Sequence, residues 1–185
     1  MSWIKITPEE KATGKLKKIY EEINKKRGKI SNIMKIHSLN PNAMEKHMDL
    51  YLTLMFRSSS LSREERELIG VVVSSINHCE YCTRHHAEAL NYYWKNSEKI
   101  QNLLHDFRSI QLPDKTYAML EYVFKLTKNP DKIEENDVEK LRDSGFSDKE
   151  ILDINLVTSY FNFVNRIALG LGVKFSDNEV KGYRY

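Results

Sequence analysis

The feature that most constrains the fold is a pair of similar segments 85 residues apart, because Ser62 in the first aligns with Ser147 in the second. Residues 61–77 read LSREERELIGVVVSSIN and residues 145–162 read GFSDKEILDINLVTSYFN. In each segment a serine is followed three residues later by a glutamate, which is the pattern of a capping box at a helix N-terminus. An apolar stretch follows both boxes, so the sequence predicts two buried helices of the same kind.

The rest of the chain also favours helices. Gly and Pro together make up 7 + 4 = 11 of the 185 residues, which is about half of typical usage. Apolar residues recur at helical spacing between short stop signals such as Gly28, Asn40-Pro41 and Asn129-Pro130. Besides the two capped segments, we expect helices over residues 12–26, 34–39, 42–56, 77–94, 114–128 and 136–143. The sequence therefore predicts an all-α domain.

The two segments differ where reactive groups occur. At the aligned positions and just beyond them, four polar or thiol residues of the first copy are replaced by apolar residues in the second. The pairs are Glu67 with Leu152, Cys79 with Val164, Cys82 with Ile167, and His86 with Leu171. This contrast selects Glu67, Cys79, Cys82 and His86 as candidate site residues.

The motif HCEYCTRHH, residues 78–86, contains both cysteines of the chain. Cys79, Cys82 and His86 are spaced three and four residues apart, so a helix would place them on one face. A structural disulfide is disfavoured because a Cys-x-x-Cys loop is short and disulfides are rare in a reducing cytosol. A zinc site is possible with His85 or His86 as a further ligand, but the chain has no second cysteine pair. A redox-active dithiol is the remaining interpretation.

A redox dithiol needs one thiol that attacks, a second that resolves the oxidised product, and a base. Cys82 and Cys79 fit the first two roles, and His86 lies one helical turn after Cys82. Glu67 lies on a mostly apolar helix, where burial would raise its pKa toward the range of a useful base. The alternative for Glu67 is an exposed first-turn glutamate that only favours the helix dipole.

The pattern E-x(11)-C-x-x-C-x(3)-H, formed by Glu67, Cys79, Cys82 and His86, resembles the AhpD-like alkylhydroperoxidases of the carboxymuconolactone decarboxylase family. The resemblance extends from about residue 41 to residue 173, and FNFVNRIALGLGV near the C-terminus is similar to the peroxidase-related subgroup. The resemblance implies an AhpD-like helical domain with a duplicated helical core, assembled as a dimer, trimer or hexamer. It also implies a division into an N-terminal helical extension (1–40), a core (41–175) and a C-terminal tail (176–185).

For the chemistry, the resemblance implies that Cys82 is the peroxidatic thiol and Cys79 the resolving one. Glu67 and His86, with a bridging water, would form the proton relay. The substrate would be a hydroperoxide, no haem, flavin or metal would be needed, and a dithiol donor such as a lipoyl-bearing or thioredoxin-like protein would reduce the disulfide. One position departs from the best-known members, which have a histidine before the second cysteine where this chain has Tyr81. A tyrosine cannot act as a base near neutral pH.

Other function classes are less well supported. The net charge is only +3, and the basic cluster in residues 17–29 is interrupted by Glu21 and Glu22, so we expect no nucleic-acid partner. The sequence shows no signal-peptide pattern and no apolar run long enough to span a membrane, so we expect a cytoplasmic protein without a membrane partner. Two non-catalytic alternatives stay open at this stage, namely a zinc-binding protein and an oligomeric interaction protein whose thiols are redox-sensitive.

Overall fold

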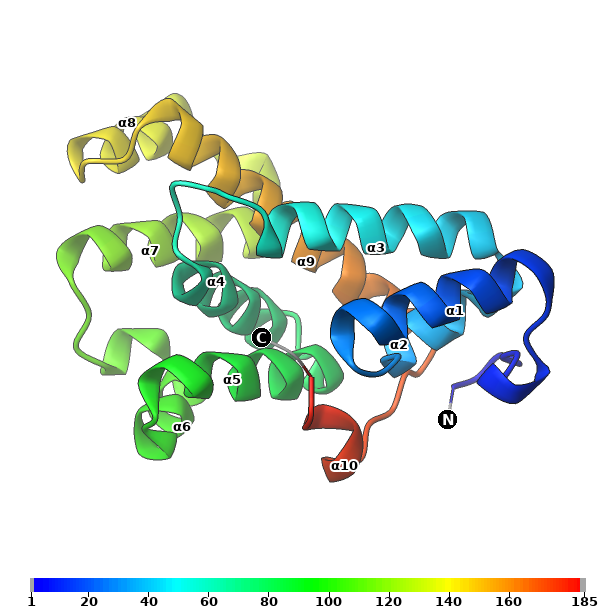
Figure 1. Cartoon of the computed structure of the whole chain (residues 1–185). Helices are drawn as coiled ribbons and strands as arrows, with labels where there is room; N and C mark the ends of the chain where they lie inside the picture. Colours follow the sequence, from blue (N-terminus) through cyan, green and yellow to red (C-terminus); the bar gives the residue numbers. More distant parts are fainter. Residues whose placement is uncertain (1, 184–185) are drawn as a thin grey trace.

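The structure is a computed structural model that describes residues 2–183. Over this range the chain forms ten α-helices and four short 3-10 helices, and no strand (Figure 1). The α-helices are α1 (Gly14–Arg27), α2 (Asn32–Lys35), α3 (Pro41–Phe56), α4 (Arg63–Ile76), α5 (Glu80–Trp94), α6 (Ser97–His105), α7 (Asp114–Lys128), α8 (Glu135–Asp143), α9 (Asp148–Gly170) and α10 (Asp177–Val180). The 3-10 helices are Glu9–Lys11, Ile36–Leu39, Phe107–Ser109 and Pro130–Lys132.

Helix α4 lies at the centre, and α5, α7 and α9 pack around it (Figure 1). Nine consecutive residues of α4, from Arg66 to Ser74, are buried, so this helix contacts protein on every side. Leu68, Ile69 and Val73 join the main core together with residues from all of these neighbours. Burial of one such side chain stabilises the fold by about 1.5–3 kcal/mol. Because α4 buries several of them, this helix stabilises the fold more than its length suggests.

The two similar segments are the helices α4 and α9, and each begins with the predicted capping box, at Ser62 and Ser147. The repeated asparagines meet in space, since Asn77 Nδ2 donates to Asn162 Oδ1 over 2.9 Å. Asn77 also donates to Asn165 Oδ1, again over 2.9 Å. Contact between equivalent residues is what two packed copies of one unit produce, so the repeat has a structural counterpart.

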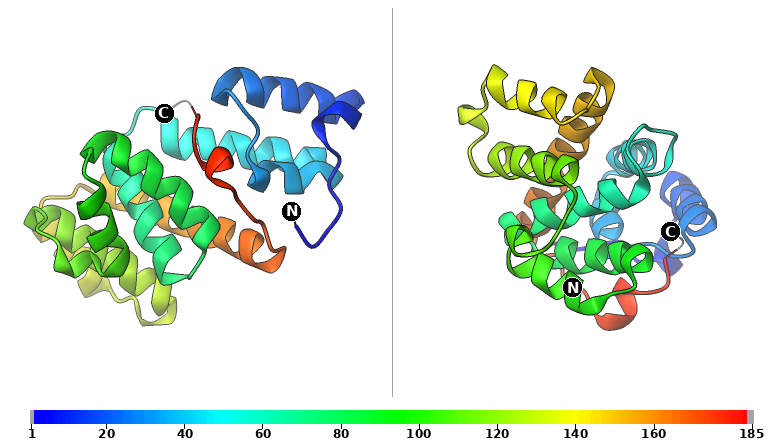
Figure 2. Two further views of the ribbon diagram at one scale, coloured as in Figure 1. Left: turned by 90° about the horizontal axis from the view of Figure 1, so that it is seen from below. Right: turned by 90° about the vertical axis from the view of Figure 1, so that its left-hand side faces the viewer.

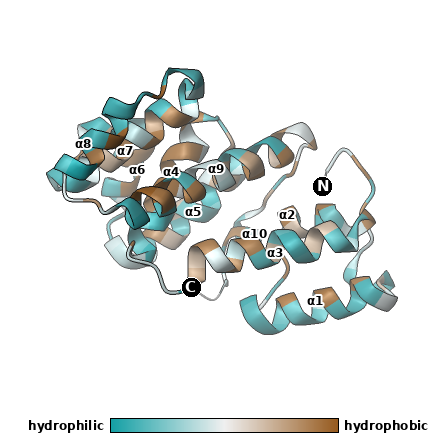
Figure 3. Cartoon of the chain, turned by 90° about the horizontal axis from the view of Figure 1, so that it is seen from above, coloured by the Kyte–Doolittle hydropathy of each residue, from teal (hydrophilic) through white to brown (hydrophobic). Residues whose placement is uncertain are grey.

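A second, smaller core lies between α1 and α3, where Leu16, Ile19 and Ile23 pack against Met44 and Met48. The outer side of α1 is largely hydrophilic (Figure 3). The short helix α10 lies between α5 and this N-terminal group, as the left view of Figure 2 shows. The C-terminal segment therefore joins the two parts of the molecule.

Most predicted helices are confirmed to within one or two residues, and 114–128 is α7 as predicted. The predicted start of the motif helix at Asn77 is wrong. Asn77 ends α4, His78 has a left-handed backbone (φ 54°), and Cys79 is the N-cap of α5. The reason is that the Asn77 side chain is taken up by its contacts with α9 and does not cap α5. No helix in residues 2–183 combines the length and hydrophobicity of a membrane span.

Candidate active site

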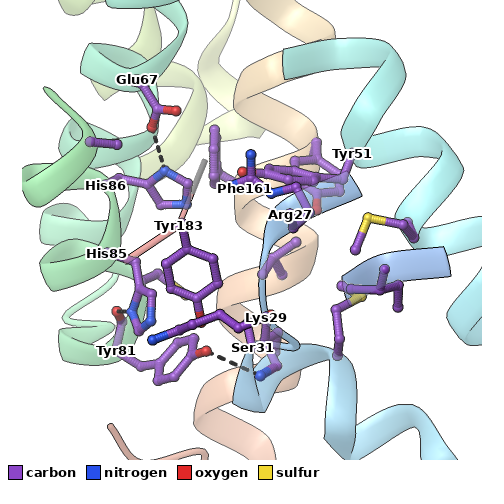
Figure 4. Close-up of a pocket in the computed structure, with 18 residues that line it drawn as sticks. Arg27, Lys29, Ser31, Tyr51, Glu67, Tyr81, His85, His86, Phe161 and Tyr183 are labelled. Carbon is purple, nitrogen blue, oxygen red and sulfur yellow. Dashed lines mark hydrogen bonds and ion pairs between the residues drawn. The ribbon is translucent and has the colours of Figure 1, made fainter. Parts of the chain in front are cut away.

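A pocket of about 80 Å³ lies where α1, α2, α3, α5, α9 and the C-terminal segment meet (Figure 4). Its wall is mostly apolar and aromatic, with contributions from Met34, Met48, Tyr51, Tyr160 and Phe161. Three of the four predicted site residues, Glu67, Cys82 and His86, also line it. The fold therefore brings a thiol, a carboxylate and an imidazole to one pocket.

The two cysteines lie side by side at the N-terminus of α5. Cys79 Sγ and Cys82 Sγ are 2.9 Å apart, close enough for one thiol to donate to the other, and they are not joined in a disulfide. Both side chains are almost completely buried, with exposed fractions of 1% and 2%. Only Cys82 lines the pocket, so access to a substrate distinguishes the two sulfur atoms.

The two thiols titrate as a pair. The hydrogen bond with Cys82 lowers the pKa of Cys79 despite its burial, and the Cys82 backbone N–H helps. The same contact with Cys79, together with burial, raises the pKa of Cys82 well above its usual value. One thiolate in the pair is thus stabilised by the remaining S–H and by the N-terminal amides of the helix. In such a coupled pair the first deprotonation is a property of both thiols together. Transfer of the remaining thiol proton from one sulfur atom to the other moves the negative charge between them.

Glu67 is fully buried, with an exposed fraction of 0%, which excludes the alternative of an exposed first-turn glutamate. Its Oε2 accepts a hydrogen bond from His86 Nδ1 over 2.6 Å (Figure 4). Its Oε1 accepts from Arg63 Nε over 2.8 Å, and Arg63 Nη2 also contacts this oxygen. A carboxylate at this position favours a proton on Nδ1, so the singly protonated ring has Nε2 as its basic nitrogen.

The expectation that burial raises the pKa of Glu67 is wrong. Burial alone would raise the pKa, but His86 and Arg63 together hold it below its usual value. Arg63 lies four residues before Glu67 on the same helix, so the two side chains are neighbours on one helical face. Glu67 is therefore an ionised carboxylate that orients His86 rather than a proton acceptor near neutral pH.

Sequence reasoning missed Asn165 on α9, which is completely buried beside the thiols. Asn165 Nδ2 donates to Ser74 Oγ over 3.1 Å, and a hydrogen bond from Asn165 lowers the pKa of Cys82, against the larger effects of Cys79 and burial. Sequence reasoning also missed Gly70, which leaves space for the His86 ring because it has no side chain. A Cβ on Gly70 would lie 2.8 Å from the Phe161 ring and 3.3 Å from His86 Cγ. No local pattern marks either residue, because both act through contacts between helices.

Tyr81 belongs to a separate cluster. Its hydroxyl donates to Glu179 Oε1 over 2.9 Å and accepts from the backbone N–H of Ile33 over 3.1 Å. Burial and the neighbouring Glu179 raise the pKa of Tyr81 well above its usual value, so it stays neutral. His85 approaches Glu179 as well, with Nε2 and Oε2 2.7 Å apart. Tyr81 and His85 thus bind the C-terminal segment instead of facing the thiols as bases.

The thiol, carboxylate and imidazole groups of the site are not arranged as metal ligands. Within residues 2–183 no group of three or more His, Cys, Asp or Glu side chains is arranged to hold a metal ion. The zinc alternative therefore gains no support from the ligand geometry.

Both the sequence and the fold are similar to those of known proteins. Residues 41–105 match the carboxymuconolactone decarboxylase family. An uncharacterised peroxidase-related protein from Silicibacter sp. is 32% identical, with a TM-score of 0.83, and the match covers 98% of this chain and 93% of that one. An uncharacterised peroxidase-related protein from Ralstonia eutropha, described as an alkylhydroperoxidase AhpD core, is 26% identical with a TM-score of 0.87, covering 97% and 94% of the two chains.

A more distant match is the debrominase Bmp8, solved with 2,3,4-tribromopyrrole. It is 16% identical with a TM-score of 0.74, over 89% of this chain and 87% of that one, and at this identity it shows the fold alone. No curated protein matches the chain by sequence. The matched residues 41–105 include the Cys-x-x-Cys motif, and the similarity to the Silicibacter protein extends over nearly the full length of both chains. The chain belongs to the AhpD-like carboxymuconolactone decarboxylase family.

Proposed function

We propose that the protein is a thiol-dependent peroxidase that reduces hydroperoxides through Cys82 and Cys79. The observation that carries this proposal is the shared pocket. Cys82 lines it, Cys79 Sγ lies 2.9 Å away, and the buried Glu67–His86 pair lines the same space. The AhpD-like relatives described as peroxidase-related support the same reaction class.

The proton path begins at Cys82. Neutral His86 presents Nε2 as its basic nitrogen because Glu67 fixes the proton on Nδ1. A water that bridges Nε2 and Cys82 Sγ carries the thiol proton to His86, and the Glu67 carboxylate stabilises the imidazolium that forms. Arg63 keeps Glu67 ionised throughout, so the carboxylate contributes charge and orientation.

The chemistry has two steps. The Cys82 thiolate attacks the terminal oxygen of R–O–OH, the O–O bond breaks, and its electron pair leaves on RO⁻. His86 returns the proton to RO⁻, which gives ROH and a sulfenic acid, Cys82–SOH. Cys79 then attacks the Cys82 sulfur, the S–O bond breaks, and the hydroxide leaves with the Cys79 proton as water. Cys82 is the attacking thiol because it lines the pocket, although the resting pair ionises first at Cys79.

The disulfide must be reduced before a second turnover. A dithiol donor does this by attacking one sulfur, forming a mixed disulfide, and expelling the protein thiol with its second sulfur. We propose a lipoyl-bearing or thioredoxin-like protein as the donor class. The two sulfur atoms are so close that oxidation to the disulfide needs little rearrangement of α5.

The test is peroxide-dependent consumption of a dithiol by three proteins. The wild type should turn over, and on oxidation its mass should fall by that of two hydrogen atoms as the disulfide forms. Cys82→Ser should be inactive. Cys79→Ser should complete one attack and stop as a sulfenic acid on Cys82, which a dimedone probe traps. Wild-type activity in Cys82→Ser would refute the assignment, and a wild type that consumes no hydroperoxide with any dithiol would favour the non-catalytic alternative.

A further inference from the structure

Cys82 is almost completely covered in this structure, yet the proposed reaction needs two different molecules to reach it. A hydroperoxide must enter, and a donor thiol must later reach the disulfide. Cys82 is only 2% exposed, and Glu67 is not exposed at all. A part of the wall must therefore move when the larger of the two molecules, the dithiol donor, reaches the disulfide.

The C-terminal segment, residues 177–183, is the wall element with the fewest apolar anchors. Its helix α10 has only four residues, and Val180 is its single buried side chain. The short helix α2 also lines the pocket, but its buried Met34 belongs to a core, as do the buried faces of α3, α5 and α9, whereas Val180 is in neither core. Short elements with few buried apolar contacts open at low free-energy cost, so this segment is the one suited to move.

Polar contacts centred on Glu179 fasten this segment. Glu179 Oε1 accepts from the Asn32 backbone N–H over 2.9 Å, from Tyr81 Oη over 2.9 Å and from Tyr183 Oη over 3.1 Å. Lys29 Nζ donates to the backbone carbonyls of residues 178 and 181 over 2.7 and 2.6 Å. The contacts reach α2, α5 and the turn after α1, so the segment connects all three.

Tyr183 is the residue of this segment that lines the pocket. In Figure 4 its ring points into the space between His86, His85 and Lys29. The ring lies 5.8 Å from the His85 ring, and Lys29 Nζ lies 4.5 Å from the ring centre. The side chain is partly exposed, as expected for a residue that separates a pocket from solvent.

We propose that residues 177–183 form a lid on the reaction pocket and that Tyr183 is its specificity-determining residue. The inference rests on the proposed peroxidase function. With the lid closed, the pocket of about 80 Å³ admits a small hydroperoxide and excludes a bulky one. With the lid open, the Cys79–Cys82 disulfide is accessible to the dithiol donor.

The test compares Tyr183→Ala with Tyr183→Phe. The alanine variant removes the ring, while the phenylalanine variant keeps the ring and loses only the hydrogen bond to Glu179. The ratio of kcat/KM for cumene hydroperoxide to that for hydrogen peroxide should rise about tenfold or more in Tyr183→Ala, since filling or emptying an apolar pocket changes selectivity by this order. The ratio in Tyr183→Phe should stay close to the wild-type value.

A second readout does not depend on turnover. In the reduced protein, a bulky aryl maleimide should label Cys82 faster in Tyr183→Ala than in the wild type or Tyr183→Phe, as followed by peptide mass spectrometry. Equal labelling in all three proteins would overturn the lid. So would an unchanged ratio of kcat/KM in an active enzyme. If the wild type reduces no hydroperoxide, the proposed function fails, and the labelling rates still decide whether residues 177–183 cover Cys82.

Discussion

Replacing Glu67 by glutamine tests the electrostatic centre of the site. Glutamine keeps the shape of the side chain and removes its charge, which leaves the buried Arg63 guanidinium without its carboxylate. Breaking a buried ion pair from one side costs about 3–5 kcal/mol. Arg63 keeps its hydrogen bond to the Met55 carbonyl (3.0 Å) and its position over the Phe56 ring, 3.7 Å from the ring centre. We therefore expect the lower end, a loss of about 3 kcal/mol in the free energy of unfolding.

The loss should depend on pH in a defined direction. The pKa of Glu67 is lowered in the folded protein, so its charge stabilises the fold above the unfolded-state pKa of about 4.3. This contribution is lost as the pH falls through the folded-state pKa. The difference in unfolding free energy between wild type and Glu67→Gln should therefore be constant from pH 7 to about pH 5 and should shrink at lower pH.

The assay is denaturant unfolding followed by circular dichroism, with Glu64→Gln as the matched control. Glu64 lies on the same helix, is exposed, and accepts from Trp94 Nε1, which a glutamine oxygen also can do. Peroxide turnover should fall by roughly 10²-fold or more in Glu67→Gln and stay unchanged in Glu64→Gln. If both variants unfold at the same denaturant concentration, Glu67 is not a buried charge that is paired with Arg63, and the account of the site is wrong.

Three further outcomes follow from the contacts of the site. Gly70→Ala should lower the free energy of unfolding by about 1–3 kcal/mol and reduce kcat, because the new Cβ would press on the buried Phe161 ring. Gly170→Ala is the control for both measurements, because Gly170 has open space around it. Asn165→Ala should cost about 1–3 kcal/mol and raise the pH at which Cys82 is alkylated, because a hydrogen bond that lowers its pKa is lost; an unchanged alkylation profile would contradict this. Glu179→Gln should speed hydrogen exchange in residues 177–183, and equal exchange in the two proteins would show that its charge does not hold the lid.

The parts of the fold that the sequence predicted well are those with local causes. Both capping boxes form as expected, because a serine and a glutamate three residues later satisfy backbone groups within one turn. The helices of residues 42–56 and 114–128 follow from apolar periodicity alone. Helix α6 was not predicted, although Asn96 caps it through the amide of Lys99. The signal was present in the residues Asn96 and Glu98, but the segment is short and its apolar stripe is narrow.

The site shows the same division between local and distant causes. The positions of Cys82 and His86 relative to each other come from helical spacing, so the sequence was sufficient to predict them. The direction of the Glu67 pKa was predicted wrongly because the effect of His86 on the carboxylate, and the smaller effect of Arg63 four residues before it, were left out. Asn165 and Glu179 are 91 and 98 residues from the groups they bind, Ser74 and Tyr81, and no periodicity in one chain encodes such pairs.

The two repeats carry different residues at equivalent positions, and this difference matters for the chemistry of the site. Helix α9 carries apolar residues at three of the four reactive positions of the first copy. This helix also forms a wall of the pocket, where Phe161 packs edge-on against His86 with ring centres 4.4 Å apart. Val164 from the same helix lines the space around Cys82. One copy thus supplies the ionisable groups and the other supplies the low-dielectric surface that strengthens their interactions. Placing a polar residue at Val164 should weaken catalysis through hydration of the thiol pair, even though no ionisable group has been touched.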